Sequence, residues 1–231
     1  MARETMGKGR RDFGVLLVTA MIAMLTASAA SAQTDDGSTS NALTGQHLGK
    51  SLPAREIHAD EHLAMPLFPV DWVQTVKQTG SIEVFEYIPK NQTETTWLDK
   101  ITLEVHHDTY TLPLDAYQRR ALGQVRENCD GVFEGNLQTG VNNGFPAAYW
   151  TLGCKRDKRG NFGETRYTKA IQGSETLYLL SRSWRTQVYG DEGPPLSPQA
   201  IDGAKNFLGA AVVCASTGQH PCPAGDNGPQ P

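Results

Sequence analysis

The chain has 231 residues, with 21 basic and 25 acidic side chains and a formal net charge of −4 at pH 7. This length suits one globular domain with additional terminal segments. The acidic balance argues against nucleic acid or an anionic membrane surface as the main partner, because both attract positively charged proteins.

Residues 1–32 have the pattern of an export signal. A basic segment ending in Arg10-Arg11 precedes an apolar run over residues 14–25, and an A-x-A cleavage site falls at residues 30–32. The apolar run is shorter than the roughly 20 residues of a membrane-spanning helix. The arginine pair leaves twin-arginine export open beside the Sec route. We therefore expect a periplasmic or secreted protein that has no transmembrane segment after cleavage.

Cleavage removes four basic and two acidic residues, so the mature chain has 17 basic and 23 acidic residues. Residues 33–65 then form a polar segment that we predict to be a flexible leader.

The leader contains His58, Glu61 and His62 in the order H-x-x-E-H. In inverted zincins, two histidines one helical turn apart bind zinc and the glutamate activates water. Prolines on both sides leave room for only a short helix here, outside the predicted core. A polar leader is the simpler interpretation, and a zinc-dependent hydrolase that uses these three residues is the alternative.

We predict a single α+β domain over residues 66–214, with an antiparallel sheet of about five to seven strands packed against two main helices. Alternating or continuous apolar residues indicate strands at 71–78, 81–89, 101–105, 145–154, 164–172 and 176–185. His106 and His107 end the third of these strands. Adjacent strand residues point to opposite faces, so these histidines cannot both bind one metal without a bend.

The first helix is predicted at residues 114–129, where apolar residues recur at helical spacing up to Cys129. Thr111 and Pro113 are start signals for it. The second helix is predicted at residues 197–213, beginning with a serine cap followed by proline. Residues 215–231 are rich in proline and glycine and are predicted to be a loose tail.

All four cysteines lie beyond the export signal, where an even number indicates two disulfides. Of the three possible pairings we prefer Cys129–Cys154 with Cys214–Cys222, because each joins neighbours along the chain. A zinc site is the rival interpretation, but it requires close pairs such as C-x-x-C, which the sequence lacks.

Several basic side chains lie on or beside the strands between residues 145 and 185. They form a candidate docking surface for an acidic partner or an anionic glycan, and solvated hairpin ends are the alternative explanation. The candidate residues are Arg156, Arg159, Arg166, Lys169 and Arg182.

The element order resembles that of the PsbP-like family of small exported proteins. Two strands are followed by a break at Tyr87-Ile88-Pro89, by Trp97 before a third strand, by a helix, by antiparallel strands and by a last helix, over residues 72–213. The resemblance implies an α+β sandwich with an accessory or binding role, and it supplies no catalytic residues.

The sequence contains no G-x-S-x-G motif, and no carboxylate spacing indicates an acid–base pair. We therefore expect an exported, non-catalytic accessory or interaction protein of the bacterial cell envelope, without a cofactor, whose partner is a protein or another envelope component. Besides the hydrolase, the remaining alternative is a small-ligand binder with a pocket lined by tryptophans. These are Trp72, Trp97, Trp150 and Trp184, which can equally be core residues.

Overall fold

A computed structural model describes residues 60–78, 80–107, 112–215 and 218–224. The predicted export signal, residues 33–59 of the predicted leader and residues 225–231 of the predicted tail lie outside the described residues.

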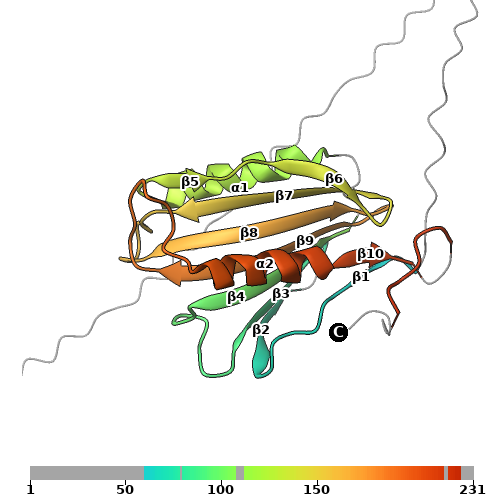
Figure 1. Cartoon of the computed structure of the whole chain (residues 1–231), viewed down its shortest axis with the longest axis horizontal. Coiled ribbons are helices and arrows are strands. Elements are labelled where there is room, and N and C mark those ends of the chain that lie inside the picture. The colour runs from blue at the N-terminus through green and yellow to red at the C-terminus, as the bar shows by residue number, and fades with distance from the viewer. Residues whose placement is uncertain (1–59, 79, 108–111, 216–217, 225–231) are drawn as a thin grey trace, which may run out of the picture. The chain divides into compact units, whose positions relative to one another are not determined.

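The α+β architecture is confirmed. Eight antiparallel strands form one sheet in the order β2-β3-β4-β9-β8-β7-β5, with β6 pairing on β7 (Figure 1). The strands are β2 Trp72–Gln78, β3 Ile82–Pro89, β4 Asp99–His106, β5 Val132–Glu134, β6 Gln138–Asn142, β7 Phe145–Cys154, β8 Gly163–Gln172 and β9 Leu177–Thr186. Six of these strands are predicted from the sequence, whereas the short edge strands β5 and β6 are not.

Helix α1, Leu114–Asn128, lies on one face of the sheet and confirms the first predicted helix. Tyr117 and Leu122 of α1 are buried against Trp150 and Leu152 of β7. Pro113 is the N-cap residue, without a side-chain cap, rather than the first residue of the helix. The last helical residue is Asn128, and the C-cap residue Cys129 already has an extended backbone.

Helix α2, Pro198–Ala210, covers the opposite face of the sheet. Ser197 caps it as predicted, since its hydroxyl accepts a hydrogen bond from the backbone N–H of Ala200 at 3.2 Å. Leu208 of α2 is fully buried against the strand residues Tyr167 and Ile171. The sheet therefore has an apolar core on each face, one under each helix.

The predicted end of the second helix, at residue 213, is wrong. The backbone becomes extended at Ala211, and Val212–Cys214 forms strand β10. This strand pairs with β1, His62–Ala64, which lies inside the predicted leader. The β-branched valines Val212 and Val213 favour a strand. The partner strand β1 lies about 150 residues away in the sequence, so the local apolar spacing does not reveal that the helix stops before β10.

Both preferred disulfides are confirmed, with Cα–Cα distances of 5.4 Å for Cys129–Cys154 and 4.9 Å for Cys214–Cys222. The first joins the end of α1 to the end of β7, and the second closes a loop after β10. Within the described part of the chain, no helix has the length and apolar character needed to cross a membrane.

Candidate functional site

The sheet face that carries α1 is polar where the helix does not reach. Helix α1 packs mainly on β7, β5 and β8, toward one edge of the sheet. Farther along the same face, the strand register places Thr102 of β4, Ser181 of β9 and Thr168 of β8 side by side. All three are buried, and the hydroxyls of Thr168 and Ser181 are hydrogen-bonded at 3.0 Å. Buried hydroxyls therefore form the floor in place of apolar side chains.

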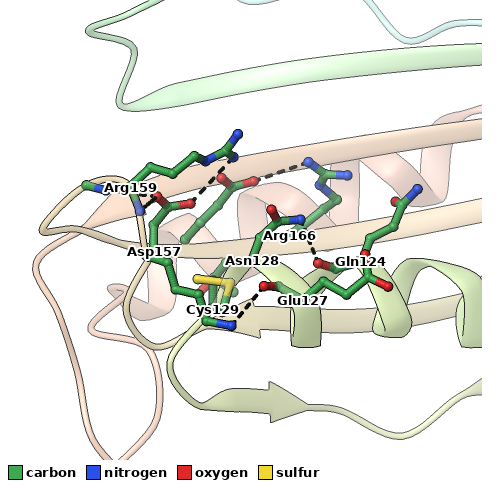
Figure 2. Close-up of a disulfide and its surroundings, with 12 residues drawn as sticks. Gln124, Glu127, Asn128, Cys129, Asp157, Arg159 and Arg166 are labelled. Atoms are coloured by element: carbon green, nitrogen blue, oxygen red, sulfur yellow. Dashed lines mark hydrogen bonds and ion pairs between the residues drawn. A yellow bond between two sulfur atoms is a disulfide. The ribbon is translucent and has the colours of Figure 1, made fainter. Parts of the chain in front are cut away.

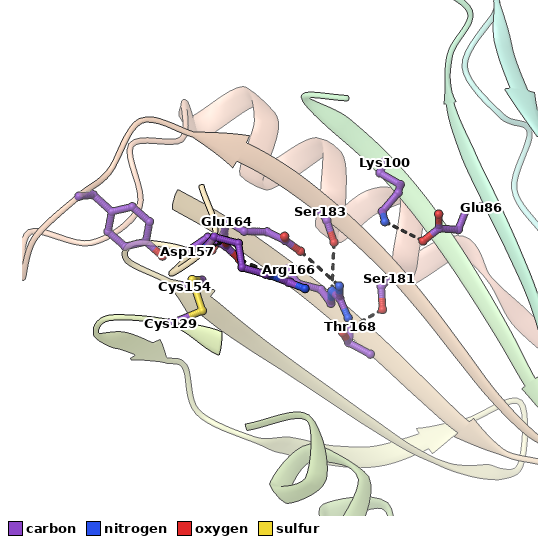
Figure 3. A network of polar contacts seen from close by, with 12 residues as sticks. Glu86, Lys100, Cys129, Cys154, Asp157, Glu164, Arg166, Thr168, Ser181 and Ser183 are labelled. Atoms are coloured by element: carbon purple, nitrogen blue, oxygen red, sulfur yellow. Dashed lines mark hydrogen bonds and ion pairs between the residues drawn. A yellow bond between two sulfur atoms is a disulfide. The ribbon is translucent and has the colours of Figure 1, made fainter. Parts of the chain in front are cut away.

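Arg166 of β8 lies at the centre of this polar face (Figure 3). Its Nε donates to the hydroxyl of Ser183 at 3.2 Å, and a terminal nitrogen donates to Glu164 at 3.2 Å. The Arg166 side chain is nevertheless 41% exposed, so part of the guanidinium faces solvent. Nearby, Lys100 and Glu86 pair at 2.6 Å across β4 and β3.

Two hollows follow α1 along this face, and we call them together the α1 groove. They have cavity volumes of about 200 and 150 Å³ and share Ala121, Gln124 and Arg166 in their linings. The larger one reaches the Cys129–Cys154 disulfide. The smaller one lies over the hydroxyl floor, between α1 and the strands β3, β4, β8 and β9.

The smaller hollow is surrounded by more positive than negative groups. Glu104 of β4 lies 3.0 Å from the ring of His106, and Arg120 of α1 and Arg166 line the same hollow. The hydrogen bond with His106, followed by the charges of His106, Arg166 and Arg120, lowers the pKa of Glu104 despite its burial. Glu104 therefore stays ionised near neutral pH. Arg120, by contrast, donates no hydrogen bond to an acceptor among the described side chains.

A corner held by a disulfide and several hydrogen bonds forms the other end of the groove (Figure 2). Here the backbones of Cys129 and Asp157 pair in a single antiparallel β-bridge. The Asp157 carboxylate accepts hydrogen bonds from the backbone N–H groups of Arg159 and Gly160 at 2.8 and 2.9 Å. Lys158 donates to the carbonyl of Glu127 at 2.8 Å, which ties this turn to the last turn of α1. The disulfide and the turn thus fix the height of α1 above the sheet.

The structure does not bring the five predicted docking residues together. Arg159 and Arg166 line the α1 groove, whereas Arg156 is exposed beyond the end of β7. Lys169 and Arg182 point to the opposite face of the sheet. There Lys169 donates to the backbone carbonyls of Gly209 and Ala211 at the end of α2, at 3.2 and 2.7 Å. Arg182 pairs with the carboxylate of Asp99.

The described part of the H-x-x-E-H motif is not helical. His62 begins strand β1, and the Glu61 carboxylate accepts a hydrogen bond from the backbone N–H of Ser174 at 2.7 Å. His58 lies outside the described residues. The helix face that the inverted zincin motif requires is therefore absent at Glu61 and His62.

The four tryptophans do not surround a common pocket. Trp150 is 1% exposed in the core under α1, whereas Trp184 belongs to the core under α2, on the other side of the sheet. Trp97 is buried beneath the charged ends of Lys100 and Arg185.

No sequence motif identifies Glu104 and Arg120 as lining residues of the smaller hollow. Strand alternation does place His106 and His107 on opposite faces. His106 is buried beside Glu104, whereas His107 lies 3.4 Å from Glu83 and is 44% exposed. Strand alternation contains the missing signal, because Glu104 and His106 share a face of β4. Arg120 reaches this face because α1 packs on the sheet through contacts between residues that are distant in the sequence, and no local sequence pattern predicts this packing.

No protein-family model matches the chain, and no curated protein matches it in sequence. Several solved structures are similar to it, including two of Mog1. One is the Ran-binding protein Mog1p of Saccharomyces cerevisiae, with 13% identity and a TM-score of 0.36 over 61% of this chain and 76% of that chain. The other is a mutant of protein Mog1, with 13% identity and a TM-score of 0.36 over 60% of this chain and 76% of that chain. No PsbP-like protein appears among the similar structures, so the resemblance to that family is wrong.

Proposed function

We propose that this protein is exported to the bacterial periplasm or beyond and acts without catalysis, by binding a partner protein of the cell envelope in the α1 groove. The signal pattern of residues 1–32 and the two disulfides support the location, because disulfides persist in oxidising compartments. The α1 groove itself is the observation that carries the binding role.

The size of the groove favours a protein partner over a small molecule. Its hollows of about 200 and 150 Å³ are smaller than the roughly 300–1,000 Å³ of typical small-molecule sites. Each can accept one or two side chains of a neighbouring protein. A row of such side chains along α1 would use both hollows at once.

The charges favour an acidic side chain of the partner in the smaller hollow. Arg120 and Arg166 line a space whose one carboxylate, Glu104, is already bonded to His106. Arg166 is paired with Glu164 at 3.2 Å, but its side chain is 41% exposed and can also face a partner. Guanidinium donors bind carboxylates with matched, often bidentate geometry, and Asp and Glu are the protein side chains that carry this group. We therefore infer that the partner inserts an Asp or Glu side chain between Arg120 and Arg166.

The same charges favour binding over acid–base catalysis. A general acid or base works best when its pKa lies near the working pH. The pKa of Glu104 moves in the opposite direction, below its ordinary value. Glu104 is thus suited to orienting neighbouring cations rather than to transferring protons.

The test compares two charge reversals on exposed helix positions. Arg120→Glu changes the groove, and the matched control Lys205→Glu changes an exposed residue of α2 on the other side of the sheet. Both variants and the wild-type mature protein are used to capture proteins from envelope extract, with mass spectrometry of the captured species. We expect a protein that wild type and Lys205→Glu retain equally and that Arg120→Glu loses at least about tenfold. Equal capture by all three proteins would contradict the proposal.

A further inference from the structure

A histidine lies directly beside the disulfide of the small β1–β10 sheet. The register pairs His62 with Cys214, and directly opposite residues in an antiparallel pair bring their side chains together. The Nε2 atom of His62 lies 3.7 Å from the sulfur of Cys214 and 3.7 Å from the sulfur of Cys222. All three atoms lie within 4.8 Å of one another.

The other ring nitrogen determines which form of His62 faces the sulfurs. Nδ1 lies 3.0 Å from the backbone carbonyl of Asp60, and a carbonyl oxygen can only accept a hydrogen bond. In the neutral ring Nδ1 therefore carries the proton, and Nε2 presents its lone pair to the two sulfurs. A carbonyl on the second nitrogen is the arrangement that orients metal-binding histidines.

We propose that His62, Cys214 and Cys222 form a zinc site when the Cys214–Cys222 disulfide is reduced. Zinc binds nitrogen at about 2.0–2.1 Å and thiolate sulfur at about 2.3 Å with tetrahedral angles, so its nitrogen and sulfur ligands lie roughly 3.6 Å apart. His62 Nε2 already has nearly this separation from both sulfurs. Only the two sulfurs have to move apart, and they do so when the bond between them is broken.

The reaction balances with a dithiol as the reductant. The disulfide takes up two electrons and two protons and becomes two thiols, while the dithiol is oxidised to its own disulfide. Zinc then binds the two sulfurs as thiolates, and two protons pass to the solvent. Among the described residues the donor group has these three members, so water is the expected fourth ligand. The half-buried His62 and Cys222 make the site reachable from the surface.

This site differs from the zincin alternative of the sequence analysis. Glu61 is bonded to Ser174 and is not part of the donor group, so only His62 is common to both. The Cys129–Cys154 disulfide is an internal control, because among the described residues it belongs to no group of three donors.

The experiment measures zinc bound to the full mature protein, oxidised or reduced with a phosphine, after dialysis. We expect about one zinc ion per reduced chain and none per oxidised chain. A Cys214→Ser/Cys222→Ser variant keeps the other two thiols and should bind none when reduced. His62→Ala should weaken binding at least about tenfold, since the loss of an outer-shell group alone weakens metal binding by about that factor.

Cobalt substitution provides a second readout that does not depend on the amount bound. The reduced wild-type protein should show the absorption of thiolate-to-cobalt charge transfer with a tetrahedral spectrum, which both variants lose. The proposal is overturned if reduced wild type binds no more zinc than the serine variant, or if His62→Ala keeps wild-type affinity and spectrum.

Discussion

Replacing Arg182 with methionine is expected to destabilise the fold, although the sequence analysis assigns Arg182 to a docking surface. Two nitrogens of Arg182 donate to the two carboxylate oxygens of Asp99 at 3.1 and 2.7 Å. The guanidinium carbon also lies 5.7 Å from the ring of Trp72 and 5.0 Å from that of Trp184. Methionine keeps most of the apolar stem, so the change mainly removes the charge and its hydrogen bonds.

The magnitude follows from the burial of the pair. The side chains of Arg182 and Asp99 are only 17% and 21% exposed, so solvent screens them less than a surface pair. Hydrogen bonds to charged groups contribute roughly 1.5–3 kcal/mol each, and cation–π contacts about 0.5–2 kcal/mol. Allowing for partial screening, we expect Arg182→Met to lower the free energy of unfolding by about 2–3 kcal/mol.

The assay is urea unfolding followed by tryptophan fluorescence, for a double-mutant cycle of Arg182→Met and Asp99→Asn. The coupling energy of the pair should be at least about 1 kcal/mol. Arg120→Met is the control and should change stability by less than about 0.5 kcal/mol, because Arg120 is exposed. A loss below about 0.5 kcal/mol for Arg182→Met, or a coupling energy near zero, would refute the structural role of Arg182.

Two further predictions concern stability. The double variant Cys129→Ser/Cys154→Ser removes a disulfide with a sequence separation of 25 and should lower the free energy of unfolding, measured in urea, by roughly 3 kcal/mol. A loss below about 1 kcal/mol would contradict a stabilising role of this disulfide. Burial lowers the pKa of Lys169 from 10.5 to about 8. Below pH 8 Lys169 is protonated in both the folded and the unfolded state, and the folded state bears the full cost of a buried charge. Above pH 8 the folded state releases the proton while the unfolded state still holds it. Stability should therefore rise with pH, by about 2 kcal/mol more between pH 7 and 9.5 in wild type than in Lys169→Met, and equal pH profiles would contradict this assignment.

The long elements of this fold are predictable from the sequence because their patterns are local. The apolar spacing up to Cys129 gives α1 nearly to the residue, and alternation gives β7 at residues 145–154. Strands β1 and β10 have three residues each and are stabilised by pairing with a distant partner. So short a segment has no periodicity of its own, and this explains why the end of α2 is predicted too late.

The candidate site is predictable only in part. Arg166 is identified from its charge, but it is grouped with Lys169 and Arg182, which face the other side of the sheet. The offset of three residues between Arg166 and Lys169 within one strand already places them on opposite faces. The contribution of Arg120 depends on where α1 docks, which is set by the packing of Tyr117 and Leu122 and not by a motif.

Site-specific photo-crosslinking in living cells tests the binding role of the α1 groove most directly. A photoreactive residue replaces Gln124, which lines both hollows and is exposed, or Asn206, an exposed control position on α2. We expect that one envelope protein is crosslinked from position 124 and not from position 206, and that Arg120→Glu abolishes this adduct. No adduct from position 124, or the same adduct from both positions, would contradict it.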